Sequence, residues 1–121
     1  MSDPAIGGGA VRSAFYRPAR QRVRELFSKD AECAFVCEGV KHPVVDLSAG
    51  GFLFAAVNGQ IWHPDTEVEG QLVLHGESVL DSKFRVARVE AYPTGPRVGV
   101  DAGQTIDLAD LLELDAERTF L

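Results

Sequence analysis

The feature of this sequence that most constrains its fold is a series of short apolar segments, each closed by turn residues, with no helical periodicity between them. Val, Phe, Leu and Ile dominate the segments, while Gly, Pro, Asn and Asp separate them, as expected for strands joined by turns. The six segments are residues 32–38, 42–47, 51–57, 66–75, 82–92 and 97–100. Parallel strands need long crossover connections, so this spacing favours antiparallel pairing. The sequence therefore predicts an all-β fold, a six-stranded antiparallel barrel.

Two local patterns add detail to this prediction. Asn58 and Gly59 follow the third segment, and this dipeptide is the strongest short signal for a hairpin turn, so we expect the third strand to turn directly into the next. In residues 82–92 the apolar positions do not alternate strictly, which predicts a β-bulge. Trp62 lies in the loop-like stretch between the strands, and we interpret it as a plug for one end of the barrel.

Residues 105–114 change to helical spacing. Leu108, Leu111 and Leu112 fall on one face of such a helix, and Asp107 or Thr105 is available as its N-cap. We expect this C-terminal α-helix to pack on the barrel.

The N-terminal segment has a different character. Residues 1–19 have little apolar periodicity and include a run of three glycines, so they are predicted to be a flexible leader, with a single domain over residues 20–121. No apolar run approaches the roughly 20 residues of a membrane-spanning helix, which predicts no membrane insertion. The N-terminus also lacks a basic start followed by an apolar stretch, so we expect a cytoplasmic protein.

Cysteine and histidine usage predicts no disulfide and no metal site. Cys33 and Cys37 lie four apart in a predicted strand, which places their Cα atoms about 13 Å apart and beyond disulfide reach. They are interpreted as reduced core residues. The three histidines, interpreted as surface or loop residues, show no ligand spacing.

Charge is distributed unevenly along the chain. The net charge is −6, but residues 1–24 carry five arginines against one aspartate, for +4, which leaves −10 for the remainder. Two interpretations of this arginine-rich arm are open: it meets an anionic ligand, or it is dispersed over the acidic body to which it is attached.

The most informative segment for function follows the second strand. Asp46 and Ser48 lie two residues apart and point the same way if the backbone is still extended, so a carboxylate and a hydroxyl can face one ligand. Gly50 and Gly51 permit close approach to the backbone. The same residues also fit an ordinary turn, in which Asp46 and Ser48 bond to neighbouring N–H groups.

The arginines preceding the first strand favour the ligand-binding interpretation. Arg20 and Arg24 lie four apart, on one face of a helical turn or on one side of an extended arm, so two guanidinium groups can reach one ligand. Arg22 is an alternative second member of this pair.

Together these residues resemble the PilZ family, whose signature is Arg-x-x-x-Arg followed, after one hairpin, by Asp/Asn-x-Ser-x-x-Gly. Arg20 and Arg24 match the first element, and Asp46, Ser48 and Gly51 match the second. The strand order of residues 20–115 also follows that of the family. The resemblance implies a six-stranded PilZ-like barrel that binds cyclic di-GMP at its surface and signals to an effector protein.

The resemblance also implies roles for the matching residues. Arg20 and Arg24, with Arg22 as the alternative, are expected to bind the phosphates and guanines, because arginine forks onto both and stacks on purines. Asp46 and Ser48 are expected to contact a guanine edge, with Gly50 and Gly51 leaving room. The leader is expected to close over the ligand.

Other functional classes remain alternatives. Asp46 and Ser48 have no histidine tied to them by sequence and no nucleophile elbow, so we expect no enzymatic activity and no cofactor. A protein-interaction module that keeps the barrel without binding nucleotide, for example in pilus or motility control, is the main alternative. Nonspecific nucleic-acid binding by the arginine arm is a less favoured third alternative, because no aromatic platform interleaves the arginines and the body is acidic, and no specific nucleic-acid partner is expected.

Overall fold

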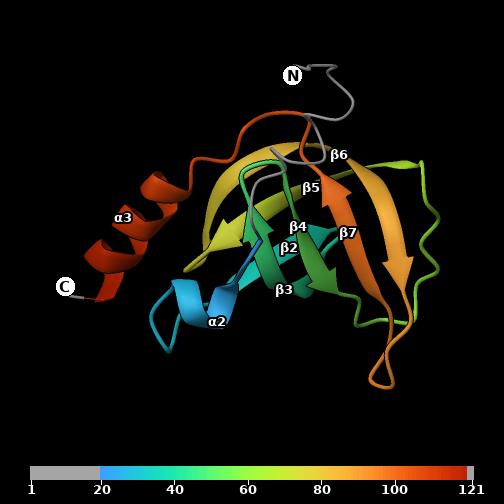
Figure 1. Ribbon diagram of the computed structural model, residues 1–121, viewed down its shortest axis with the longest axis horizontal. Coiled ribbons are helices and arrows are strands. Elements are labelled where there is room, and N and C mark those ends of the chain that lie inside the picture. Colours follow the sequence, from blue (N-terminus) through green and yellow to red (C-terminus); the bar gives the residue numbers. More distant parts are fainter. Residues whose placement is uncertain (1–19, 120–121) are drawn as a thin grey trace, which may run out of the picture.

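The strands of residues 20–119, the part of the chain described by the computed structural model, close into a six-stranded antiparallel barrel with one strand outside it (Figure 1). The predicted leader, residues 1–19, lies outside the described residues. The ring order is β3-β2-β5-β6-β7-β4, and pairing of β3 with β4 closes it, which confirms the predicted fold. The barrel strands are β2 (Cys33–Cys37), β3 (Val40–Ser48), β4 (Gly51–Ala55), β5 (Glu67–Leu74), β6 (Glu77–Glu90) and β7 (Arg97–Asp101).

Aromatic rings fill the barrel interior. Phe35 is fully buried, and its ring centroid lies 5.0 Å from that of Phe54 and 5.3 Å from that of Phe84. Such tilted and edge-on contacts are the favoured arrangements of aromatic pairs. Cys33 and Cys37 are both buried, so their prediction as core residues is confirmed.

The predicted hairpin at Asn58 and Gly59 is wrong. The edges of β4 are already occupied by β3 and β7, so the chain that leaves β4 has no free edge on which to fold back. Asn58 instead makes a local turn, its side-chain oxygen accepting the Gln60 N–H at 3.2 Å. The loop then brings Trp62 over the end of the core against Phe54, at 5.0 Å between ring centroids, which confirms its interpretation as a plug.

Bulges interrupt three of the strand pairings. The predicted bulge in β6 is confirmed, because the β6–β7 register shifts between Val86 and Arg88. A second shift lies in β3 between Val44 and Asp46, and the β5–β6 pairing has a third. Each extra residue reverses the face on which the following side chains lie.

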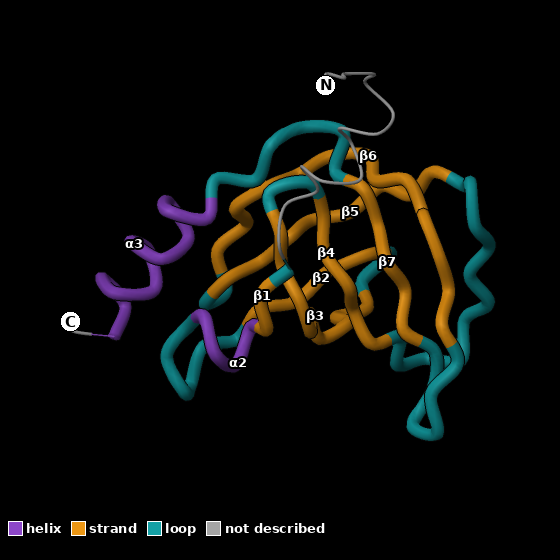
Figure 2. Tube along the Cα trace, viewed as in Figure 1, coloured by secondary structure: helices purple, strands orange, loops and turns teal. Residues whose placement is uncertain are grey.

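Two short elements precede the barrel. β1 (Gln21–Arg22) is the outer strand and pairs antiparallel with β3, so that Arg22 lies opposite Asp46. α2 (Val23–Leu26) follows directly. The tube view shows β1 and α2 beside β3 on the outside of the barrel (Figure 2).

The C-terminal helix α3 (Leu108–Thr119) begins as predicted, because the Asp107 carboxylate accepts the N–H groups of Ala109 and Asp110. Leu111 is buried, but Leu112 is 40% exposed, so the prediction that Leu112 shares the packed face is wrong. The helix also runs past the predicted end at residue 114. None of the helices in residues 20–119 has the length and apolarity needed to cross a membrane.

A buried carboxylate attaches α3 to two other parts of the molecule. Asp115 accepts the N–H of Ser28 at 2.8 Å and its hydroxyl at 2.7 Å, and it lies 2.7 Å from the Nε2 atom of His75. Ser28 follows α2, and His75 lies in the turn between β5 and β6. Asp115 therefore joins three segments that are distant in sequence.

Candidate functional site

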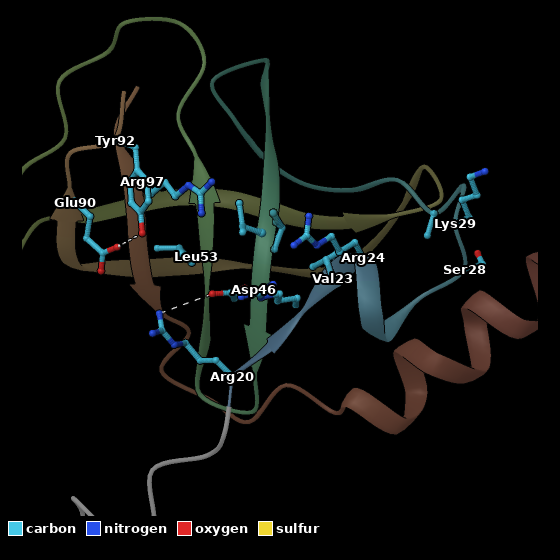
Figure 3. A pocket seen from close by; sticks show the side chains of 14 residues that line it. Arg20, Val23, Arg24, Ser28, Lys29, Asp46, Leu53, Glu90, Tyr92 and Arg97 are labelled. Atoms are coloured by element: carbon cyan, nitrogen blue, oxygen red, sulfur yellow. Dashed lines mark hydrogen bonds and ion pairs between the residues drawn. The ribbon is translucent and has the colours of Figure 1, made fainter. Parts of the chain in front are cut away.

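A pocket with a volume of about 520 Å³ lies on the outside of the barrel, where β1 and α2 border the sheet (Figure 3). We call it the arginine pocket. Its size is within the range of small-molecule sites. Five cationic and two acidic side chains line it: Arg20, Arg22, Arg24, Lys29 and Arg97, with Asp46 and Glu90. The pocket thus carries an excess of three positive charges, whereas the whole chain has a net charge of −6.

Leu53 forms an apolar floor between these charges. On β4 it alternates with Phe52 and Phe54, which belong to the barrel core, so its side chain points outward. It lines the bottom of the pocket and is only 3% exposed, so the apolar surface that it offers is small. A charged wall around an apolar floor suits a ligand with both ionic and flat apolar parts.

Both acidic groups of the pocket follow bulges. Val44 points into the core, and without the bulge at Val45 strict alternation would bring Asp46 into the core as well. The bulge in β6 acts in the same way after Val86, so Glu90 pairs with Arg97 on the outer face. Irregular strand geometry therefore brings the two carboxylates to the pocket.

The three predicted arginines line the arginine pocket and differ in their ion-pair partners. Arg20 reaches Asp46 at 4.0 Å, with the two side chains 48% and 19% exposed, and Arg22 reaches Glu25 at 4.0 Å. Among the described residues, no carboxylate forms an ion pair with Arg24 or Arg97. The pocket therefore has guanidinium groups available for an added anion.

A second, smaller pocket of about 290 Å³ adjoins the first and shares Arg20 and Leu53 with it. We call it the glycine pocket. It contains the other predicted residues, Ser48, Gly50 and Gly51, together with Arg88. Arg20 is thus the only predicted residue that lines both pockets.

The Ser48 hydroxyl already takes part in the turn between β3 and β4. It accepts the N–H of Gly50 and donates to the carbonyl of Gly51, both at 3.3 Å. These contacts match the ordinary-turn interpretation for Ser48. Asp46 makes no such turn contact within the described residues and instead faces Arg20.

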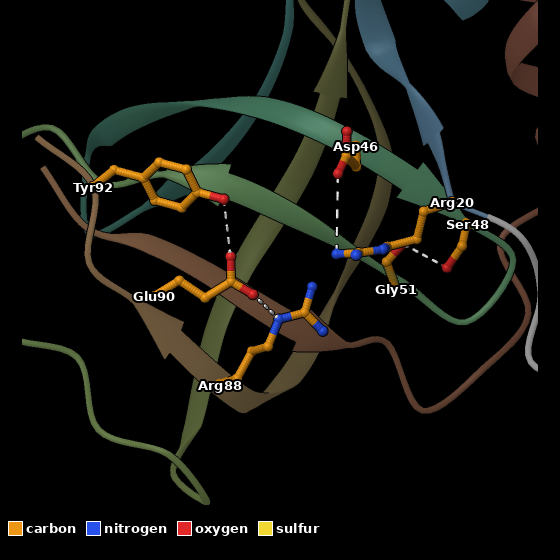
Figure 4. A network of polar contacts seen from close by, with 7 residues as sticks. All are labelled: Arg20, Asp46, Ser48, Gly51, Arg88, Glu90 and Tyr92. Atoms are coloured by element: carbon orange, nitrogen blue, oxygen red, sulfur yellow. Dashed lines mark hydrogen bonds and ion pairs between the residues drawn. The ribbon is translucent and has the colours of Figure 1, made fainter. Parts of the chain in front are cut away.

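The β6 side of the arginine pocket contains a connected polar network (Figure 4). Arg88 donates through Nε to Glu90 Oε2 at 2.5 Å, and the Tyr92 hydroxyl donates to Glu90 Oε1 at 3.2 Å. The Arg97 guanidinium carbon lies 4.2 Å from the centre of the Tyr92 ring, a cation–π contact. Arg88 lies beside Gly99, where any side chain would meet it.

Sequence reasoning identified one side of this site and missed the other. Arg20, Arg22, Arg24 and Asp46 do meet at one pocket, and Ser48, Gly50 and Gly51 at the neighbouring one. The missed residues are Lys29, Arg88, Glu90, Tyr92 and Arg97. The spacing of Arg88, Glu90 and Tyr92 was only a partial signal, since alternate residues of an extended chain share a face but the sequence does not say which face.

No protein-family model matches the sequence, and no curated protein matches it.

Proposed function

We propose that this protein is a cytoplasmic regulatory module of the PilZ type, which binds cyclic di-GMP in the arginine pocket and signals to a partner protein. The observation that supports this most directly is the meeting of Arg20, Arg22 and Arg24 with Asp46 at a cationic pocket on an acidic chain. A cyclic dinucleotide carries two phosphates and two flat bases. The charged wall and the Leu53 floor complement both parts.

In the proposed complex, the arginines hold the phosphates and stack on the bases. A guanidinium forks onto phosphate oxygens, and it also packs flat on a purine. Arg24 has no ion-pair partner among residues 20–119, so it binds an anion without first losing a contact. Arg20 lies 4.0 Å from Asp46, so it moves only slightly to exchange the carboxylate for a phosphate.

The decisive experiment is calorimetric titration of cyclic di-GMP into the full chain, with Arg24→Ala and Arg85→Ala measured at the same salt concentration. Charge-assisted hydrogen bonds contribute roughly 1.5–3 kcal/mol, so Arg24→Ala should weaken binding by about tenfold to a hundredfold. Arg85 is the matched control, because it lies on β6 outside both pockets and pairs with Asp65.

Micromolar or tighter binding by the unaltered chain and Arg85→Ala, weakened in Arg24→Ala, is the expected result. An unaltered chain that gives no heat with cyclic di-GMP would overturn the proposal. The barrel would then fit the alternative of a protein-interaction module, in which the arginine pocket meets an acidic protein segment.

A further inference from the structure

The arginine pocket contains an anion that phosphate binding does not require. Glu90 stands among Arg20, Arg97 and the Arg88 side chain, where a neutral residue would leave the pocket more attractive to phosphate. Its position is not a by-product of core packing, because the bulge in β6 turns it outward. A carboxylate at this point calls for a ligand group that donates hydrogen bonds.

Glu90 is held in place as an ionised acceptor. The hydrogen bond from Arg88 lowers the pKa of this carboxyl group and outweighs the opposing effect of burial, and the charge of Arg88 and the hydrogen bond from Tyr92 lower the pKa further. Each carboxylate oxygen receives one of these hydrogen bonds. A carboxylate has about four lone-pair sites, so both oxygens retain capacity for a further donor.

The neighbouring ring offers a place for a flat base. Tyr92 is 40% exposed, and it lines the arginine pocket together with Arg97, which packs against its ring. Aromatic side chains and guanidinium planes are the usual stacking surfaces for nucleobases. A base placed against Tyr92 or Arg97 presents its edge close to Glu90, which is bonded to the same tyrosine.

Guanine and adenine differ in what they present to such a carboxylate. Guanine has two adjacent donors, N1–H and the N2 amino group, which match the two oxygens of a carboxylate. Adenine has a lone pair at N1 and a carbon-bound hydrogen beside it, so the same placement leaves the carboxylate facing an acceptor. A site built for a donor rejects an analogue that lacks it far more strongly than a merely apolar pocket does.

We propose that Glu90 is the specificity-determining residue of the pocket and selects guanine over adenine by accepting N1–H and N2–H from one base of the ligand. This inference rests on the proposed function. Arg88 and Tyr92 act as positioning residues that fix the carboxylate.

The test is to titrate cyclic di-GMP and cyclic di-AMP separately into the unaltered chain, Glu90→Gln and Glu117→Gln. The unaltered chain should prefer the guanine ligand by about a hundredfold or more. Glu90→Gln should reduce that ratio at least tenfold, partly by improving adenine binding, because an amide offers a donor to adenine N1. Glu117→Gln makes the same charge change on the exposed face of α3 and should keep the full ratio.

The outcomes separate the two proposals. If the unaltered chain binds neither dinucleotide, the proposed function itself fails. If it binds cyclic di-GMP and Glu90→Gln keeps the same guanine preference, the function stands and the role of Glu90 is overturned. Thermal unfolding of each variant checks that a lost preference does not come from a misfolded barrel. The ratio of the affinities for the two dinucleotides, measured on one protein sample, does not depend on the fraction of that sample that is active.

Discussion

Two adjacent glycines in the turn between β3 and β4 have opposite steric surroundings. A Cβ atom built on Gly51 would lie 2.0 Å from the carbonyl oxygen of Val100, whereas one on Gly50 would have nothing within 4 Å. Gly51 begins β4 and pairs with Asp101 of β7. The close approach of the β4 and β7 backbones therefore accounts for the glycine at position 51, whatever room it leaves for a ligand.

We expect Gly51→Ala to destabilise the protein by about 1–3 kcal/mol or more, because the methyl group meets backbone that cannot move without opening the β4–β7 pairing. Gly50→Ala is the matched control and should change the free energy of unfolding by less than about 1 kcal/mol, since it adds a methyl group in open space. Urea unfolding of both variants measures the difference. Equal stability of the two variants would show that the β4 and β7 backbones do not approach closely at Gly51.

The prediction for His42 failed because it considered the residue without its position in a strand. His42, interpreted from the sequence as a surface or loop residue, is fully buried on β3, which makes that interpretation wrong. Its Nδ1 accepts the Val57 N–H at 3.2 Å, and burial lowers the pKa of its ring, which favours the neutral form in the core. The strand begins at Val40, two residues earlier than predicted, and alternation with Val44 then directs His42 inward.

Of the two acidic residues in the arginine pocket, Asp46 was predicted from the sequence and Glu90 was not, and the reason differs from that for His42. Asp46 was identified because it belongs to a local motif, whereas Glu90 belongs to none. Its role depends on which face of β6 it occupies, and one extra residue at the bulge decides that. The hydrophobic pattern of residues 82–92 predicted a bulge but not its position. The residues of this strand that face outward could therefore not be assigned.

Among the elements, α3 is attached to the rest of the molecule by few but specific contacts. Leu111 is its one buried apolar residue within the described part of the helix, and Asp115 supplies the polar attachment. Burial opposes ionisation of Asp115, but the hydrogen bonds from His75 and Ser28 outweigh it and lower the pKa of this carboxyl group. The ionised form of Asp115 therefore favours the docked helix.

This attachment makes stability depend on pH in a defined direction. A carboxyl group whose pKa is lower in the folded state contributes stability above its unfolded pKa of about 4 and loses it as pH falls through the folded value. We expect Asp115→Asn to destabilise the protein by about 1–3 kcal/mol at pH 7, with the difference from the unaltered chain shrinking below about pH 4. Chemical unfolding at a series of pH values measures this.

Glu113→Gln is the control for that series, since it removes an exposed carboxylate from the same helix. Its free energy of unfolding at neutral pH should equal that of the unaltered chain. A stability difference for Asp115→Asn that stays constant from pH 7 to pH 3 would show that the contacts do not depend on the ionised carboxylate.

At the scale of whole elements, the sequence predicted which segments are strands better than it predicted their connections. All six strand segments and the C-terminal helix are present near the predicted positions. The hairpin after β4 failed because Asn58 and Gly59 report only local turn preference, while ring closure decides which edges are free. β5 pairs instead with β2 and β6, a choice that depends on the assembled barrel.

The whole molecule combines an acidic body with a cationic pocket. At an ionic strength of 0.1 M the screening length is about 10 Å, so a ligand in the arginine pocket responds mainly to the nearby cations and less to the net charge of −6. The arginine pocket and the rest of the protein therefore present different electrostatic surfaces.

Salt should weaken the proposed binding accordingly. We expect the affinity for cyclic di-GMP to fall by roughly tenfold when sodium chloride rises from 50 to 500 mM, because the exposed guanidinium groups are screened. Guanosine, which lacks the phosphates, is the control ligand, and any binding it shows should be nearly independent of salt. Isothermal titration at several salt concentrations measures both, and a salt-independent affinity for the dinucleotide would argue against phosphate contacts.

Ser28 links the arginine pocket to the C-terminal helix α3. Ser28 lines the arginine pocket and at the same time gives its N–H and hydroxyl to Asp115 of α3. Ser28 thus connects the pocket to the C-terminal helix, so a ligand that displaced Ser28 would change the free energy with which the helix is held. Linkage is reciprocal. Any contact that stabilised or released α3 would then change the affinity of the pocket for such a ligand by the same factor, without touching the pocket itself.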